Sequence, residues 1–250
     1  MEQWRCSRGV CESEIVMPFT KRSLTFFRQL ARNNEKSWFE AHRTDYENEV
    51  RAPMRELIEE LDARFAEFAP EIGGDTKRSM FRINRDIRFS KDKSPYKTHA
   101  AAWFHHRNAA RAVGSEADAG SAGYYFHLEP GGRSLIGGGL WMPPRQQLNK
   151  LRTAIADDPR GFGKMVGSIP RRFGGLDDES MLKRMPRGYD EDHPAAKWLR
   201  YQSFTTGRGL TDAQVTSASL ATLLAKEFEA ILPLVRWLNS ALGFRPADRR

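Results

Sequence analysis

The spacing of apolar residues changes after Gly73-Gly74, and this change limits the folds available to the chain. Before the two glycines, apolar side chains recur every three or four residues over residues 23–32 and again over 37–68, which is typical of amphipathic helices. Over residues 80–89 they recur every second residue, which is typical of a half-buried strand. The sequence therefore predicts helices and strands in separate blocks.

Two residues interrupt these patterns. Pro53 lies within the second helical stretch, and because proline cannot donate to the helix ladder, we expect a kink or a new helix there. Arg85 occupies an apolar position of the strand expected over residues 80–89. We expect Arg85 either to be buried against a carboxylate or to be displaced by a bulge, and both departures are found at functional sites.

The next part of the chain predicts further strands. One strand is expected over residues 99–106, followed by a loop over 110–122. Residues 124–129 and 133–141 predict a hairpin about the turn Pro130-Gly131-Gly132. The run Gly137-Gly138-Gly139 in this hairpin allows a close approach of the backbone, either to a neighbouring element or to an anion.

Helices return in the C-terminal part. Thr211 and Gln214 form a capping box before a long helix that Pro233 should bend. The class is therefore α+β, a single domain with a mostly antiparallel sheet and helices N- and C-terminal to the strand block. We expect this domain over residues 17–243, between a disordered tail at 1–16 and a second tail at 244–250. The other elements expected here are helices at 145–156, 159–168, 178–185 and 193–200 and a strand at 202–207.

Composition excludes several classes of protein. The chain has 250 residues, 40% of them hydrophobic, and six Trp with fifteen Phe argue against disorder. No apolar run approaches the roughly 20 residues of a membrane-spanning helix, so no membrane partner is expected. The only cysteines, Cys6 and Cys11, make neither a disulfide framework nor a zinc site. With no apolar core of a secretory signal in the first sixteen residues, we expect a cytoplasmic protein.

The positive charge is concentrated in one segment. The net charge is +8, and residues 77–97 hold eight basic and two acidic side chains. Residues 35–67 hold five basic and ten acidic side chains, which we interpret as the solvated outer face of a helix. A local excess of cations favours an anionic ligand or partner.

The same segment supplies the candidate site. Asp86 and Tyr96 are candidate acid–base groups, because a carboxylate and a phenol among cations can have shifted pKa values. A phosphate- or carboxylate-bearing small molecule would suit this cluster, since charge-assisted bonds to such groups are strong. The cations expected to hold this ligand are Arg82, Arg85, Arg88, Lys93 and Lys97.

Other interpretations stay open. The cations could pair with the acidic helix at residues 35–67 and serve only to hold the fold, or they could bind nucleic acid or an acidic protein partner without chemistry. A metal site at His99, His105 and His127 is the less favoured alternative, so neither a metal nor a cofactor is predicted. The chain has no P-loop and no G-x-S-x-G nucleophile elbow, and whether it is an enzyme stays open.

Residues 82–97 read RINRDIRFSKDKSPYK and fit the pattern R-x-x-R-D-x-R-F-x-x-x-K-x-P-Y-K. This pattern resembles the signature of the bacterial and fungal family called domain of unknown function 2461. Further likeness lies in Asn33-Asn34, in Gly139-Leu140-Trp141 and in Trp237-Leu238, so the resemblance covers roughly residues 18–243. The family carries no assigned activity, and the resemblance therefore implies no catalytic residue.

Overall fold

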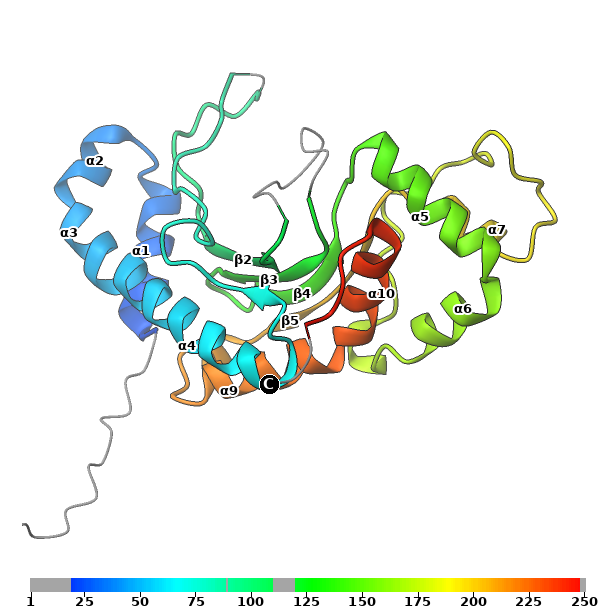
Figure 1. Cartoon of the computed structure of the whole chain (residues 1–250). Coiled ribbons are helices and arrows are strands. Elements are labelled where there is room, and N and C mark those ends of the chain that lie inside the picture. Colours follow the sequence, from blue (N-terminus) through cyan, green and yellow to red (C-terminus); the bar gives the residue numbers. More distant parts are fainter. Residues whose placement is uncertain (1–18, 89, 110–119, 248–250) are drawn as a thin grey trace, which may run out of the picture.

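The computed structural model describes residues 19–88, 90–109 and 120–247. The expected tail at residues 1–16 and most of the expected loop at 110–122 lie outside these ranges. The predicted arrangement of blocks is confirmed, with helices N- and C-terminal to a strand block, and the class is α+β (Figure 1). No described helix combines the length and the apolar character that crossing a bilayer requires.

The N-terminal block begins at Thr20, whose side chain caps the first helix in a capping box with Ser23. Pro53 lies in the first turn of α4 and has no N–H to donate, and the chain accommodates it with a turn of π-helix just before it. The elements are α1 (Lys21–Arg32), α2 (Lys36–Ala41), α3 (Arg43–Tyr46), the π-helix η1 (Glu47–Arg51) and α4 (Ala52–Phe68).

The sheet is an antiparallel meander with the order β1-β2-β3-β4-β5 among the described residues. Each strand thus pairs with its neighbours in sequence. The expected hairpin about residues 130–132 is confirmed as the pair β3–β4. The strands are β1 (Ile72–Gly73), β2 (Ala100–His106), β3 (Gly123–Leu128), β4 (Ser134–Leu140) and β5 (Phe204–Leu210).

The remaining helices follow β4 and β5. Between the two strands lie α5 (Arg145–Asp157), α6 (Pro159–Gly167), the 3-10 helix η2 (Arg171–Phe173) and α7 (Ala196–Leu199). After β5 come α8 (Asp212–Val215), α9 (Leu220–Ala230) and α10 (Leu232–Leu242).

Two expectations for this part are wrong. Residues 178–185 form no helix, and Met181 instead makes an isolated antiparallel β-bridge with Tyr201. The long helix after Thr211 is divided into α8, α9 and α10, and Pro233 stands in the first turn of α10, where its missing N–H costs nothing.

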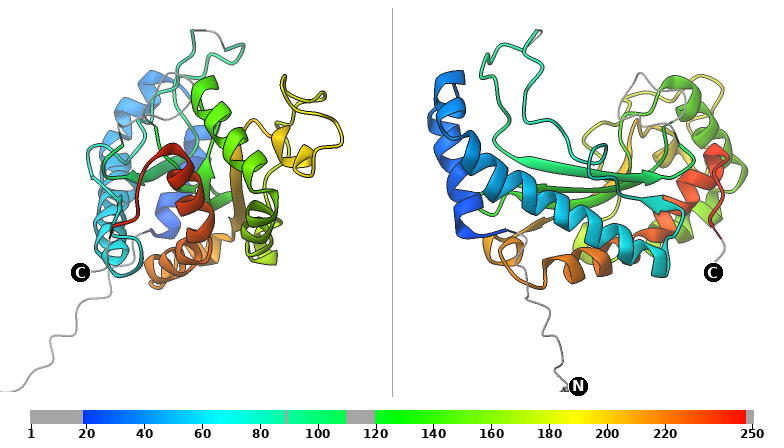
Figure 2. Two further views of the ribbon diagram at one scale, coloured as in Figure 1. Left: turned by 45° about the vertical axis from the view of Figure 1, so that its right-hand side comes forward. Right: turned by 60° about the vertical axis from the view of Figure 1, so that its left-hand side comes forward.

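Helices cover one face of the sheet. In Figures 1 and 2, α4, α9 and α10 lie against this face, α1–α3 stand at one end and α5–α7 at the other, while no described helix covers the opposite face. The covered side holds the core, and its aromatic centre is fully buried. This centre consists of Phe65, Phe104, Tyr124, Phe126 and Phe228. The sheet is therefore a platform with one open face.

The strand expected over residues 80–89 does not form. Its base touches the edge of β2, where Met80 bridges Ala102, and the chain then leaves the sheet. Residues 80–98 fold back on themselves: the N–H of Arg85 donates to the carbonyl of Pro95 (2.9 Å), and that of Lys97 to the carbonyl of Ile83 (2.8 Å). We call residues 80–88 and 90–98 the arm, which projects beyond the open face in Figure 1. The exposure of the side chains still alternates over residues 81–88 as expected, because the chain is extended there.

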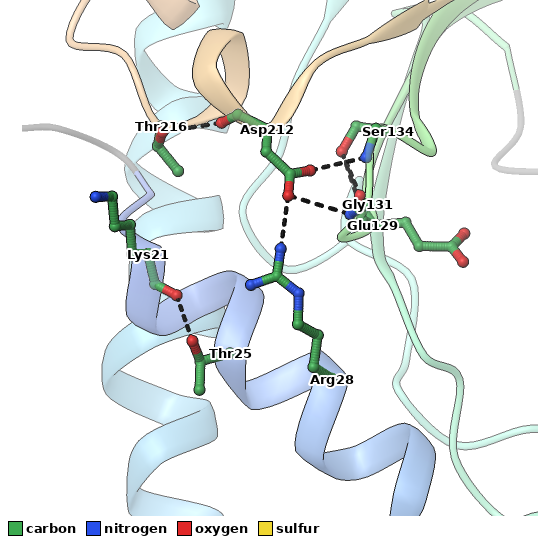
Figure 3. A network of polar contacts seen from close by, with 9 residues as sticks. Lys21, Thr25, Arg28, Glu129, Gly131, Ser134, Asp212 and Thr216 are labelled. Carbon is green, nitrogen blue, oxygen red and sulfur yellow. Dashed lines mark hydrogen bonds and ion pairs between the residues drawn. The ribbon is translucent and has the colours of Figure 1, made fainter.

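Asp212 ties three elements together at the end of the sheet (Figure 3). Its carboxylate accepts from the guanidinium of Arg28 in α1 (2.6 Å) and from the backbone N–H groups of Gly131 (3.2 Å) and Gly132 (2.9 Å) in the β3–β4 turn. Both glycines have positive φ (82° and 70°), which glycine adopts without strain, so the turn directs both N–H groups at one acceptor.

We expect Asp212→Ala to lower the free energy of unfolding by about 1–3 kcal/mol, because one ion pair is lost and two turn N–H groups lose their acceptor. Urea unfolding followed by circular dichroism measures this. Asp157→Ala, which removes an exposed carboxylate from the end of α5, is the matched control and should cost less than 0.5 kcal/mol, about the usual size of a surface change. Equal losses in the two variants would contradict the anchoring role of Asp212.

Candidate functional site

A groove of about 840 Å³ lies between the N-terminal helices and the base of the arm. Helices α2, α3, η1 and α4 supply one wall, and residues 76–84 with Pro95 and Tyr96 supply the other. We call it the cationic groove. Its charged lining residues are Lys36, Glu40, Arg43, Glu47, Arg51, Arg55, Lys77 and Arg82.

Positive charge is in excess in this groove. Its two carboxylates are already paired, Glu40 with Arg43 (2.7 Å) and Glu47 with Arg51 (2.8 Å). The four other lining cations have no ion-pair or hydrogen-bond partner for their charged groups among the residues that the structure describes. These four are Lys36, Arg55, Lys77 and Arg82. Cations therefore outnumber carboxylates in the lining of the groove, and an excess of this kind favours an anion over a cation.

Tyr96 forms part of the groove wall and is held in place from two sides. Its ring stacks on that of Phe39 with 4.1 Å between centroids. The side chain of Asn34 clamps its backbone, accepting from the N–H of Tyr96 (3.0 Å) and donating to its carbonyl (2.9 Å). Burial, and then the charge of Glu40, raises the pKa of Tyr96, so its phenol is protonated at neutral pH and can donate a hydrogen bond.

A smaller hollow of about 330 Å³ lies on the other side of Tyr96, and both Arg85 and Lys97 line it. Arg85 forms an ion pair with Asp92 within the arm. A carboxylate partner is thus present, but the expected burial is not, because the side chain of Asp92 is 60% exposed. Hydrogen bonds, first from Ser94 and then from Arg85, hold the pKa of Asp92 well below its usual range. This charge pair is satisfied within the arm itself.

The remaining predicted residues lie farther along the arm. Arg88 donates to both carboxylate oxygens of Asp86 (3.0 and 2.7 Å), and this side-chain bond is the main cause that lowers the pKa of Asp86 to about 2. Lys93 donates to the carbonyl of Ile87 (2.9 Å). Asp86 is thus ionised at neutral pH.

The structure distributes the predicted set over three places: Arg82 in the groove, Arg85 and Lys97 in the smaller hollow, and Asp86, Arg88 and Lys93 farther along the arm. Only Tyr96 borders both hollows. Asp86 and Tyr96 do not line a common hollow, since Asp86 borders neither one.

Arg82 and Lys97 nevertheless influence one another. The ammonium of Lys97 lies over the ring of Phe81, 5.3 Å from its centroid, and Arg82 is the next residue. Burial lowers the pKa of Lys97, and the positive charge of Arg82 lowers it further. Neither cation pairs with a carboxylate among the described residues, so an anion placed between them would relieve their repulsion.

The cations on the helical wall are not among the residues predicted from the sequence. Arg43, Glu47, Arg51 and Arg55 follow one another at intervals of four, which places them in a row on one side of the helical segment. This four-residue spacing is the one feature of the sequence that could have indicated a charged row on the helical wall. It was obscured because the acidic majority of residues 35–67 predicted a solvated outer face.

The other expected features can be placed as well. A Cβ added at Gly137 would lie 2.4 Å from the carbonyl oxygen of Thr206, so this glycine allows close packing of β4 on β5. The rings of His99 and His127 lie 5.3 Å apart. Within the described ranges no group of three or more His, Cys, Asp or Glu side chains is arranged to hold a metal ion.

Comparison with known proteins gives one match. The family described as conserved hypothetical protein, domain of unknown function 2461, matches residues 22–237. The chain belongs to this family. The matched range runs from α1 into α10, so the groove and the arm both belong to the domain of unknown function 2461. No curated protein and no solved structure matches the chain.

Proposed function

We propose that this member of the domain of unknown function 2461 family binds a phosphate- or carboxylate-bearing small molecule in the cationic groove. The observation that supports this most is the set of four unpaired cations in a hollow of about 840 Å³, which is within the size range of small-molecule sites. Without a bound anion, such a local excess of positive charge would disfavour the folded state, because the cations repel one another.

Arg82 is the central residue of this proposal. Its guanidinium offers a planar fork to a phosphate or carboxylate, and Arg55 from α4 faces the same hollow. Lys97 lines the smaller hollow rather than the groove, and its ammonium over the ring of Phe81 would add to the positive field at the ligand. Arg85, Arg88 and Lys93 would contribute to the wider positive field of the arm.

The proposal is one of binding, and catalysis stays open. At neutral pH Asp86 is ionised and Tyr96 is protonated, so Asp86 would act as a base and Tyr96 as an acid in any proton transfer. Only Tyr96 lines the groove, and it would first serve as a hydrogen-bond donor to the anion. A cytoplasmic location is part of the same proposal.

A nucleic-acid or acidic-protein partner is the second candidate, because the side chain of Arg88 is 76% exposed and Lys93 is exposed on the same projecting arm. Contacts to nucleic-acid phosphates release counterions, so affinity would fall steeply with salt. Binding of oligonucleotides at low salt that Arg88→Gln weakens and Arg82→Gln does not would favour this candidate.

We expect Arg82→Gln to weaken binding of pyrophosphate or citrate about tenfold or more, because a charge-assisted bond to a fixed guanidinium is lost. Isothermal titration calorimetry at low ionic strength measures this affinity. Arg64→Gln is the matched control, because it also replaces one arginine by glutamine. Arg64 lies in α4, pairs with Glu60 and does not line the groove, so its replacement should leave the affinity unchanged. The proposal is wrong if the unmodified protein binds neither probe.

The unfolding temperature separates a binding role from a scaffold role. Because Arg82 has no ion-pair partner among the described residues, Arg82→Gln should leave the unfolding temperature of the ligand-free protein unchanged or slightly higher. A drop of several degrees would instead assign Arg82 to the scaffold.

A further inference from the structure

A third hollow, separate from the cationic groove and from the smaller hollow beside Tyr96, lies over the open face of the sheet. It measures about 460 Å³, and its walls are predominantly apolar. We call it the aromatic cavity. Its main lining residues are Phe81, Trp103, Tyr125, Trp141, Gly137 and Gly207.

Strand register creates this cavity. Trp103, Tyr125, Gly137 and Gly207 are consecutive partners across β2, β3, β4 and β5, so they form one row on one face of the sheet. Half of the row carries large aromatic rings and the other half has no side chain. The row therefore has aromatic side chains at one end and only backbone at the other, which leaves room on the sheet for a flat group.

The exposed side chain of Trp141 stands at this cavity. Trp141 is 57% exposed, and with Met142 it is one of the two large apolar residues in the described ranges that are left in solvent. An exposed aromatic ring beside a hollow is available to a ligand, since burying its apolar surface is favourable. A flat ring in the cavity would cover this indole.

The aromatic cavity and the cationic groove share one lining residue, Phe81. Its ring makes an edge contact with Tyr125 of the cavity (6.3 Å between centroids) and lies under the ammonium of Lys97. Arg82, the next residue, lines the groove. Two cations thus flank the boundary between an apolar hollow and a polar one.

We propose that the ligand carries a planar aromatic ring as well as an anionic group, as a nucleotide does, with the ring in the aromatic cavity and the anionic group in the cationic groove. This inference rests on the proposed function, because it takes the groove as the anion site. Aromatic side chains stack on any nucleobase, so the cavity selects flatness rather than one base. Because the ring and the anionic group would each occupy a hollow of its own, a ligand that carries both should bind more tightly than an anion without a ring or a ring without a charge.

The test compares pyrophosphate with ADP, GDP, CDP and UDP by isothermal titration calorimetry, and follows tryptophan fluorescence. At least one of the nucleotides should bind about tenfold more tightly than pyrophosphate and quench the fluorescence. Trp141→Ala should weaken that nucleotide about tenfold and leave pyrophosphate unchanged, because loss of one stacking ring has an effect of this size. Trp141→Phe retains a ring and should retain most of the affinity.

The two proposals fail in different ways. If pyrophosphate binds through Arg82 but no nucleotide binds more tightly, and Trp141→Ala changes nothing, the ring site is overturned and the anion site stands. If adenosine binds in a Trp141-dependent way while pyrophosphate and the nucleotides show no dependence on Arg82, the proposed function is wrong, and the inference that one ligand spans both hollows falls with it.

Discussion

Arg236→Met is expected to lower the free energy of unfolding by about 3–5 kcal/mol, because it leaves a buried carboxylate without its cation. Glu71 is 4% exposed, and the guanidinium of Arg236 donates to both of its carboxylate oxygens (2.6 and 3.1 Å) and to the carbonyl of Phe68 (3.0 Å). The pair joins α10 to the segment between α4 and β1. Equilibrium unfolding in urea, followed by circular dichroism, gives the value.

A double variant separates the two effects. Glu71→Gln combined with Arg236→Met removes both charges, so it should be more stable than Arg236→Met alone. A loss of less than 1 kcal/mol in the single variant would contradict the expected cost of the unpaired carboxylate. A double variant less stable than the single one would contradict the view that the unpaired charge of Glu71 is the main cost of Arg236→Met.

Phe65→Ala is expected to lower the free energy of unfolding by about 3–5 kcal/mol, because it opens a cavity at the centre of the core. Phe65 is fully buried, and its ring contacts those of Phe104 (5.1 Å), Tyr124 (5.5 Å) and Phe228 (6.0 Å). These residues belong to β2, β3 and α9, so one ring from α4 touches both the sheet and a C-terminal helix. Urea unfolding measures the loss.

The conservative change Phe65→Leu is the control. It retains most of the buried volume and should cost roughly half as much or less, since the loss depends on the size of the void that remains. Similar losses for Ala and Leu would show that ring stacking, and not filled volume, is what Phe65 contributes.

Much of the fold could be predicted from periodicity. The change of spacing at Gly73-Gly74 indicated the order of blocks, and the Pro130-Gly131-Gly132 turn gave the β3–β4 hairpin, because both signals are local. The error over residues 80–89 is informative. Alternation of apolar and polar residues shows only that a segment is extended, with one apolar and one polar side. The arm meets this condition, yet only its base is hydrogen-bonded to the sheet.

The candidate site was only partly predictable. Arg82 was identified because it belongs to a basic segment, but the groove also needs the helical wall with Arg51 and Arg55. Tertiary packing decides which surface of the helices faces the base of the arm. The net charge of residues 35–67 is negative, and this average hides a row of cations among acidic neighbours. The aromatic cavity depends on cross-strand register, which residue spacing within one strand does not specify.

The base of the arm also decides whether copies of this protein can join edge to edge. The N–H of Trp103 donates to the carbonyl of Ser79 (3.0 Å), and the N–H of Phe81 donates to that of Ala101 (2.9 Å). Ser79 and the base of the arm thus occupy hydrogen-bonding groups along β2 that β1 leaves uncovered. A strand with such groups free is a template for pairing with another chain. Substitutions that detach the arm are therefore expected to cause self-association as well as loss of one wall of the cationic groove, so the groove and the resistance of the protein to aggregation depend on the same backbone contacts.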